Sequence, residues 1–382
     1  MQRRSLAAGT VAFVVALLAS HFRSSPYNNY TLLADALLHG HTWINWPGEY
    51  IDALGFNGRH YVIEAPVPAI LLLPYVAIAG TAANQTLLAV LLAGVATGAA
   101  WELGERLGIS AAANAWLCTF LLAGTDLLWC AMLGDVWFIA HVSAVCFTML
   151  VLVELSGKRR GWLVALYAVC AAESRFTLAL VIPVYAAMLA YADRGRLRAN
   201  LAGFGGVLAG AACLWVAYNF ARWGTAYDIG YTTWYHQDQA GMPTGSPFQL
   251  RYLGYELWSF FSQRPDVANA FPWLRPSYSG VALTWTSPAL IYALWARTPR
   301  PLVIALWIAA VLTAVPNFLY YVNGFAQYGM RHALDFIPFL YALMVLAARE
   351  RLAGWVKVLI VYSCAASVYG VWFWNVFIRS GQ

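Results

Sequence analysis

The sequence predicts an all-α, polytopic membrane protein. Hydrophobic residues make up 61% of the 382 residues and charged residues only 10%, compared with roughly 25% charged residues in soluble domains. Apolar runs of about 20 residues, the length that an α-helix needs to cross a bilayer, recur along the chain. Because lipid offers no partners for backbone polar groups, helices are the expected spanning elements. We expect residues 1–382 to form a single transmembrane domain.

The first apolar run follows a basic start, Arg3 and Arg4, and extends to about Ser20. A cleaved signal peptide is the alternative, because the Leu-Ala-Ser sequence before His21 resembles a cleavage site. The run is long for a signal core and further runs follow, so we expect a retained anchor. Its basic start predicts a cytoplasmic N-terminus and an external first loop at about 22–85.

The next apolar segment, Ala69 to Gly80, is short and bordered by prolines, of which Pro68 precedes it and Pro74 interrupts it. It is too short to span a bilayer comfortably. If it crossed, the later basic clusters would lie outside, against the positive-inside rule. We therefore predict a non-spanning helix in the interface.

The remaining apolar runs predict ten more spans, which with the first makes 11. They lie at roughly 86–104, 111–130, 136–155, 162–174, 177–193, 201–221, 281–296, 302–322, 333–348 and 354–377. Cytoplasmic loops then hold Lys158/Arg159/Arg160, Arg194/Arg196/Arg198, Arg297/Arg300 and Arg349/Arg351. In this topology 14 of the 23 basic residues lie inside, whereas 12 of the 17 acidic residues lie outside. A second large external loop is expected at about 222–280.

Several classes of function are excluded or weakened by composition. The net charge of +6 comes from short loops between spans, which is the positive-inside pattern and not a nucleic-acid surface. The six cysteines form no CxxC pair and are expected to be small buried residues. We find no P-loop, dinucleotide-binding, HExxH or GxSxG motif. The absence of an internal repeat gives little support to an inverted-repeat transporter.

Acidic residues of the first loop are the first candidates for chemistry. Asp35 lies in the stretch TLLADALLHG, whose pattern predicts a short amphipathic helix on the membrane. It is either a solvated residue or a general base that takes a proton from a bound hydroxyl group. Asp52 and Glu49 are alternatives, and the sequence does not rank the three.

The second external turn, from Asp126 to Asp135, adds two more carboxylates. With Trp129 and Trp137 beside them, they are either interface anchors or ligands for a sugar hydroxyl or a divalent metal such as Mg²⁺ or Mn²⁺. His141 lies one turn into the next span, where an imidazole faces protein or a wet cavity rather than lipid. A hydrogen-bonded structural histidine is the commoner outcome.

Two arginines stand at the outer ends of predicted spans, Arg175 in AESRF and Arg331 in YGMRHALD. Glu173 or Asp335 is an available salt-bridge partner. The alternative is an anionic lipid headgroup, since a guanidinium binds phosphate through two parallel hydrogen bonds. In the large outer loop, YDIGYTTWYHQD carries Tyr231 among aromatic and polar residues that suit either a sugar face or lipid headgroups.

These features together resemble the GT-C superfamily of polytopic glycosyltransferases. The closest likeness is to bacterial relatives of protein O-mannosyltransferases and of the lipid A aminoarabinose transferases. The resembling stretches are YTLLADALLHGH, GRHYVIEAPVPAILLLP, YNFARWGTAYDIGY and YGMRHALDFIPF. The family has a cytoplasmic N-terminus, an essential acid and interfacial helices in the first external loop, and a second acid in the next one. Its donor is a polyprenyl-phosphate-linked sugar.

The sequence departs from the family pattern at two places. The family's acidic pair lies a few residues before the first helix, where this chain has Pro26 and Tyr27, so Asp35 or Asp52 would act from a different register. Glu64 stands where the family has a basic residue before its proline pair. Arg59 or His60 would then replace that residue.

The resemblance implies an inverting glycosyltransferase on the outer face of a bacterial cytoplasmic membrane. It would move a sugar to a lipid, glycan or protein acceptor, with no nucleic acid involved. The expected catalytic residues are Asp35 and Asp52. The expected substrate-binding residues are Arg59, His60, Glu64, Asp126, Asp135, His141, Arg175, Tyr231 and Arg331, with Asp126 and Asp135 as candidate metal ligands. A non-catalytic protein that binds or transports lipids is the alternative.

Overall fold

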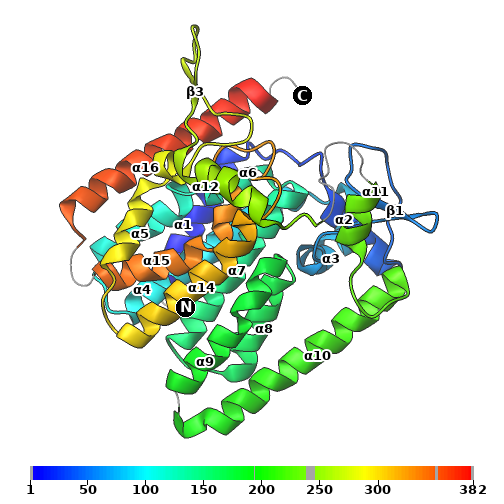
Figure 1. The fold of residues 1–382 in the computed structure, drawn as a ribbon, viewed down its shortest axis with the longest axis horizontal. Coiled ribbons are helices and arrows are strands. Elements are labelled where there is room, and N and C mark those ends of the chain that lie inside the picture. The colour runs from blue at the N-terminus through cyan, green and yellow to red at the C-terminus, as the bar shows by residue number, and fades with distance from the viewer. Residues whose placement is uncertain (1–2, 193, 238–245, 349–351, 380–382) are drawn as a thin grey trace.

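A computed structural model describes residues 3–192, 194–237, 246–348 and 352–379 (Figure 1). Asp238, Arg349 and Arg351, named in the sequence motifs and basic clusters, lie outside the described residues. Helices dominate the chain, as the sequence predicts, and the strands are short. In the first half the helices are α1 (Arg3–Ala19), α2 (Asn29–Leu38), α3 (Val67–Ala79), α4 (Gln85–Arg106), α5 (Ala111–Ala123), α6 (Leu127–Leu133), α7 (Val136–Leu155), α8 (Gly161–Ala172) and α9 (Ile182–Ala192).

The second half is also helical. Its helices are α10 (Leu197–Trp223), α11 (Gly230–Gln237), α12 (Leu253–Ser262), α13 (Leu283–Thr286), α14 (Arg300–Phe318), α15 (Ile337–Ala348) and α16 (Gly354–Phe373). Turns of 3₁₀ helix include η2 (Phe176–Val181), η5 (Pro288–Trp295) and η6 (Arg331–Asp335). Two small antiparallel hairpins pair β1 (Leu54–Phe56) with β2 (Arg59–Tyr61), and β3 (Asp266–Val267) with β4 (Leu274–Arg275).

Five helical segments in the described part of the chain are long and apolar enough to cross a membrane. They contain α4, α7, α10, α14 and α16, and a sixth exists if α5 and α6, which meet at a bend of 48°, form one span. These segments fit the predicted class of helical membrane protein. The other predicted spans coincide with shorter helices.

Three of the shorter helical segments differ from the expected uninterrupted spans for an identifiable reason. Prolines interrupt them: Pro183 follows η2 at the start of α9, Pro288 opens η5, and Pro338 stands in the first turn of α15. Proline has no backbone N–H and cannot continue an α-helical hydrogen-bond ladder on its N-terminal side. A second difference is that the external turn expected between Asp126 and Asp135 contains the helix α6.

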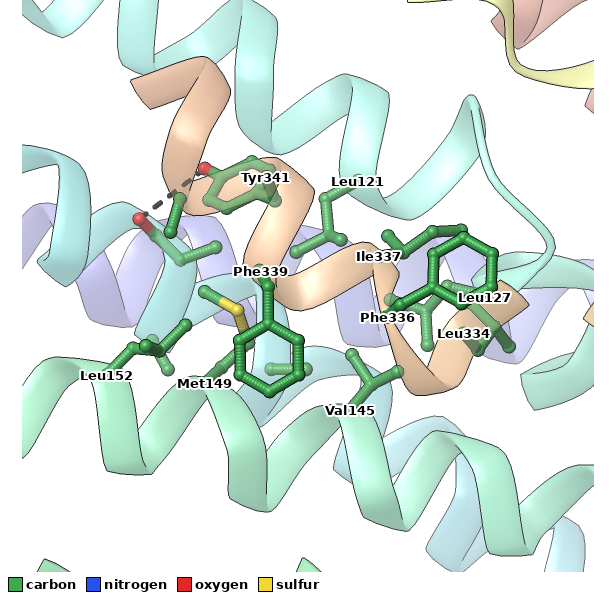
Figure 2. Close-up of a cluster of buried hydrophobic side chains, with 14 of the residues drawn as sticks. Leu121, Leu127, Val145, Met149, Leu152, Leu334, Phe336, Ile337, Phe339 and Tyr341 are labelled. Atoms are coloured by element: carbon green, nitrogen blue, oxygen red, sulfur yellow. Dashed lines mark hydrogen bonds between the residues drawn. The ribbon is translucent and has the colours of Figure 1, made fainter. Parts of the chain in front are cut away.

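The core lies where α5, α7 and α15 meet (Figure 2). Met149 and Val145 of α7 face Phe339 and Ile337 of α15, and Leu121 of α5 closes the cluster. The hydroxyl of Tyr341, also on α15, donates a hydrogen bond of 3.5 Å to the backbone carbonyl of Ala100 in α4. Large apolar side chains therefore join helices that are far apart in the sequence.

Helix α1 packs closely on α4 through two glycines. A Cβ atom on Gly9 would lie 2.9 Å from the carbonyl oxygen of Gly94, and a Cβ atom on Gly94 would lie equally close to the carbonyl oxygen of Gly9. Small residues at such a crossing let two helix backbones approach. At the same interface Ser5 donates a hydrogen bond of 2.8 Å to Glu102.

The first loop folds into a cap over one end of the bundle. Tyr30, Leu33 and Ala34 of α2 are buried in a cluster that includes α3 and the first turns of α7. The predicted short helix around Asp35 is present as α2. In Figure 1, α2, α3 and the β1–β2 hairpin gather on the right-hand side, where the far end of α10 also lies.

Helix α10 is the longest helix and the least buried of the apolar ones. Near its start, Gly203 approaches Trp162 of α8, where a Cβ atom would meet the Trp162 backbone nitrogen at 3.3 Å. Its other end meets the first loop, because Arg222 donates a hydrogen bond of 2.7 Å to the carbonyl of Val62. From its contacts with α8 and α9 it runs to the first loop (Figure 1), and much of its surface stays exposed.

Candidate functional site

A buried carboxylate, Asp335, connects four parts of the chain. It is fully buried in η6 and accepts hydrogen bonds from five nitrogen or oxygen donors. Arg175 donates through Nε (3.2 Å) and Nη2 (3.1 Å), and His141 of α7 donates through Nδ1 (3.0 Å). Thr177 of η2 (2.8 Å) and Asn317 of α14 (3.2 Å) complete the set. So many donors keep the carboxylate ionised and fix its partners in place.

These contacts show which side chains Arg175 and Arg331 meet, the two arginines for which the sequence offers an acidic partner. Asp335 pairs with Arg175, whereas Arg331 places its guanidinium over the ring of Phe138, 5.1 Å from the centroid. The reason is the 3₁₀ geometry of η6. With three residues per turn, side chains four positions apart point about 120° away from each other. A pairing of Arg331 with Asp335, which an α-helix would permit, is therefore wrong.

Arg331 instead lies near the acids of the second external segment. It is 8% exposed, and its Nε has no hydrogen-bond partner in the described part of the chain. Burial lowers its pKa to about 10. Asp135 is also buried and accepts a hydrogen bond of 2.5 Å from Ser25. Burial raises the pKa of Asp135 to about 6, while Ser25, Arg379 and Arg331 act in the opposite direction.

Asp126 packs against the loop that leads to Arg331. A Cβ atom on Gly329 would lie only 2.3 Å from Oδ1 of Asp126. Among the residues that the structure describes, no group of three or more His, Cys, Asp and Glu side chains could hold a metal ion. Asp126 and Asp135 both lie within the electrostatic influence of the Arg331 guanidinium. The Mg²⁺ or Mn²⁺ site stays a prediction.

A second polar group lies between the first loop and α10. Glu64 is 8% exposed, and its Oε2 has no hydrogen-bond partner among the described residues. Burial and, to a smaller extent, the nearby charge of Asp52 raise its pKa to about 8, while backbone hydrogen bonds and Arg222 act in the opposite direction. Arg222 itself forms an ion pair of 3.8 Å with Asp228. Near neutral pH, Glu64 is therefore mostly protonated and is a hydrogen-bond donor.

Tyr30 lies within electrostatic range of both Glu64, in this second group, and Arg175. Its ring is fully buried in α2, and its pKa is raised first by burial and then by the charge of Glu64, while Arg175 lowers it. Tyr231 of α11 also raises the pKa of Tyr30 through its charge. The ring centroid of Tyr231 lies 6.2 Å from that of Phe176, the residue that follows Arg175. We call Asp52, Glu64, Tyr30, Arg175 and Tyr231 the loop cluster.

Three sequence candidates lie away from the loop cluster. Asp35 is about one-third exposed and is 3.8 Å from His39 of the same helix. Five residues separate it from Tyr30, so the two point about 140° apart around α2. Arg59 stacks over Trp43 at 5.1 Å, and His60 stacks on Trp46 with centroids 4.3 Å apart. These contacts place them on the outer hairpin.

The structure adds residues that sequence reasoning did not select. Thr177 and Asn317 bind Asp335, and Arg222 approaches Glu64. Their common signal is a polar side chain at the end of an apolar run, as in VPNF for Asn317 and NFARW for Arg222. That signal is weak, because such residues also occur as ordinary helix termini.

All of these groups lie at the same end of the bundle. The starts of α7 and α15 meet the ends of α8, α10 and α14 there. The opposite end holds a different set of ion pairs, Arg106 with Glu102 and Arg160 with Glu154, each at 2.9 Å. The fold and the site thus define a helical, membrane-type protein with buried charged groups at both ends of the bundle, and those around Asp335 form the candidate site. Comparison with known protein families, curated proteins and solved structures gives no match.

Proposed function

We propose that the chain is a GT-C-type glycosyltransferase with 11 spans, whose loop cluster faces the outer side of a bacterial cytoplasmic membrane. It transfers a sugar from a polyprenyl-phosphate donor to a lipid, glycan or protein acceptor. The charge asymmetry of the sequence supports this orientation, since the end with Lys158, Arg159 and Arg160 carries the cytoplasmic signature.

One observation carries the proposal. Two first-loop acids, Asp52 and Glu64, lie in the same cluster as Arg175, whose Nε and Nη2 both donate hydrogen bonds to the carboxylate of Asp335. An inverting transfer needs a base on one side of the anomeric carbon and positive charge at the leaving group on the other. The loop cluster supplies both kinds of group, together with aromatic rings that suit a sugar.

The roles follow from protonation and placement. Because Glu64 is mostly protonated near neutral pH, Asp52 is the better base, and Glu64 donates a hydrogen bond to the sugar or acceptor. The acceptor hydroxyl gives its proton to Asp52, and its oxygen attacks the anomeric carbon. The bond from that carbon to the phosphate oxygen breaks, and the departing polyprenyl phosphate takes both electrons. Arg175 stabilises the negative charge that develops there.

The experiment incubates the purified protein with a panel of polyprenyl-phosphate sugars and measures product formation. Asp52→Asn should lower turnover by about 10² to 10⁴-fold, since an amide cannot accept the proton. Arg175→Lys should reduce it less, because a point charge replaces a planar fork. Asp35→Asn is the matched control and should retain activity.

Two results would redirect or end the proposal. Loss of turnover in Asp35→Asn with retention in Asp52→Asn would move the base to Asp35. No turnover with any donor, combined with binding of polyprenyl phosphate, would favour the non-catalytic lipid-binding or transport protein. Against that alternative, a transporter needs a site reachable from both sides near the midplane, whereas the loop cluster lies at one end.

A further inference from the structure

Helix α12 buries its polar side and exposes its apolar side. Its buried residues, with the glutamine that follows it, are Glu256, Ser259, Phe260 and Gln263. Its exposed apolar residues are Tyr255, Leu257, Trp258 and Phe261, each between 39% and 51% exposed. With about 100° between successive residues, each set covers one side of the helix. A helix that meets water shows the opposite arrangement, so the exposed side of α12 requires an apolar neighbour.

A network of hydrogen bonds fixes this orientation. Ser259 donates a hydrogen bond of 2.8 Å to Gln263, which donates one of 2.7 Å to the hydroxyl of Ser279. Asn323 donates to the hydroxyl of Ser259 and, at 3.0 Å, to the backbone carbonyl of Ser279. Rotation of α12 would break these bonds and leave buried polar groups without partners, which is unfavourable. The aromatic side of α12 therefore faces outwards in the folded protein.

The depth of α12 follows from its contact with α14, a candidate membrane span. Phe261 contacts Phe318, the last residue of α14, with ring centroids 6.0 Å apart. At helical spacing Phe318 lies on the same side of α14 as Val311 and Val315. These two valines are 54% and 44% exposed. The apolar side of α12 thus continues an exposed apolar surface of the span, at the end of α14 opposite Arg300.

The residue types match the boundary between lipid headgroups and acyl chains. Tyrosine and tryptophan are enriched at that boundary, and Tyr255 and Trp258 stand on the exposed side of α12. Arg251 precedes the helix and Arg264 follows it, and both are exposed. Anionic headgroups attract basic residues near the membrane surface. Lipid therefore matches both the apolar side of α12 and the charges at its two ends.

We propose that α12 binds the surface of the lipid bilayer, with Trp258 and Phe261 inserted among the acyl chains and Arg251 and Arg264 at the headgroups. Residues 250–264, within the external loop predicted at about 222–280, then lie in the membrane boundary and not in water. In the topology of the proposed function, in which Arg300 is cytoplasmic, this is the outer boundary. The lipid contact itself does not depend on glycosyl transfer.

The test measures where single side chains of the full chain lie in vesicles of phosphatidylglycerol and phosphatidylcholine. Trp258→Cys and Phe261→Cys are each introduced into a chain whose six native cysteines are replaced by alanine, and each carries a nitroxide spin label. Collisions with oxygen, which partitions into hydrocarbon, are compared with collisions with a water-soluble nickel chelate. Both labels should favour oxygen and lie about 5–10 Å into the boundary, the usual depth of an interfacial helix.

Two other labelled sites are the controls. Ile308→Cys lies on the exposed side of α14 within the candidate span and should favour oxygen more strongly. Glu49→Cys lies on an exposed part of the first loop and should favour the nickel chelate. The same pattern is expected in an Asp52→Asn background, so a failure of the proposed function would leave this result unchanged.

The arginines are tested in the same vesicles. Raising the share of phosphatidylglycerol should draw both α12 labels deeper, and the double variant Arg251→Gln, Arg264→Gln should remove that response. No response in the chain that keeps both arginines would overturn their role at the headgroups.

Two results would overturn the lipid contact. A preference of both α12 labels for the nickel chelate would place this side of the helix in water. Few collisions with either reagent would show that protein, such as a second copy of the chain, covers it.

Discussion

Glu64 is a carboxyl group that folding removes from water, and this has a consequence for stability. Its pKa rises from 4.5 to about 8, mainly through burial. The folded state therefore binds a proton more tightly than the unfolded state, so its stability falls as pH rises between those two values. We expect the melting temperature of the wild-type protein to decline from pH 5 to pH 8, whereas Glu64→Gln should flatten this decline. Thermal unfolding in detergent across that range measures it.

The matched control is Glu49→Gln, since Glu49 belongs to the same loop but is exposed. That variant should keep the slope of the wild-type protein. An identical slope in Glu64→Gln and the wild-type protein would show that Glu64 does not titrate in this window.

Asp335 and Arg175 should behave as an energetic pair. Removing Asp335 leaves the Arg175 guanidinium without its partner, which costs about 3–5 kcal/mol for a buried charge. A double-mutant cycle of Asp335→Ala and Arg175→Ala should give a coupling of more than about 1 kcal/mol, because the two side chains are in contact. The measurement is the free energy of unfolding of the four proteins.

Arg331 supplies the control for this cycle. Since Arg331 does not contact Asp335 and acts only through its partners Arg175 and His141, the coupling between Arg331→Ala and Asp335→Ala should be smaller than that between Arg175→Ala and Asp335→Ala. A larger coupling for Arg331 than for Arg175 would restore the pairing that the sequence suggested and would contradict the geometry of η6.

For single residues, the sequence indicates which polar side chains are buried in the protein better than it indicates which residues they contact. The sequence singles out His141, Arg175 and Arg331 because a charged or polar group at the end of a span requires a partner. His141 and Arg175 contact Asp335, whereas Arg331 lies over the ring of Phe138. The partner of Arg331 was not predictable, because it depends on η6 being a 3₁₀ turn. Asp35 was selected from a local pattern, although its helix turns it away from the buried cluster.

Among the elements, the crossing of α1 and α4 depends on backbone contact rather than on side chains. Gly94→Val would place a branched side chain where the Gly9 carbonyl lies, at 2.9 Å from the first added atom. Overpacking of this kind costs about 1–3 kcal/mol. We expect a lower melting temperature and weaker association of α1 with the bundle, measured by thermal unfolding and by protease sensitivity of residues 3–19.

Gly210→Val in α10 is the comparison, because an added Cβ atom there meets nothing within 4 Å. It should leave the melting temperature nearly unchanged. Equal destabilisation by both substitutions would indicate a general loss from replacing glycine, not a close helix crossing.

Element positions were predictable where an apolar run was long and uninterrupted, as for α4, α7 and α10. They were less so where proline changed the helix type, as at Pro183 and Pro288. The sequence predicts a turn where the seven-residue helix α6 lies, because short apolar helices have no pattern of their own in a chain that is apolar throughout.

For the whole molecule, the orientation of the chain depends on whether α3 crosses the membrane. Its 13 residues would extend about 20 Å, less than the hydrocarbon core of about 30 Å. We expect Thr81→Cys, at an exposed site after α3, to react with a membrane-impermeant maleimide added from outside. The background is a chain whose six native cysteines are replaced by alanine.

Lys158→Cys is the opposite control and should react only after the membrane is permeabilised. Protection of Thr81→Cys together with labelling of Lys158→Cys from outside would mean that α3 does cross, and it would remove the 11-span topology. Labelling of both from the same side would mean that an even number of spans, not the three predicted, separates residues 81 and 158.

Composition was enough to predict the helical, membrane-type class, because burial in lipid limits the backbone to few solutions. The buried site was only partly predictable. Its contacts join Asp335 to residues 158 to 194 positions away in sequence, such as Arg175, Thr177 and His141. Local patterns carry no information about which span ends meet.

Helix α10 is also long enough for a small tilt to matter. Its N-terminal end packs against α8, and much of its middle is exposed. Near its C-terminal end, Arg222 donates a hydrogen bond to the carbonyl of Val62. Twenty-seven residues make a rod of about 40 Å, so a tilt of about 5° at the base moves the tip by about 3.5 Å. That displacement exceeds the length of a hydrogen bond. A tilt of that size would therefore break the hydrogen bond from Arg222 to the carbonyl of Val62 and separate this end of α10 from the first loop.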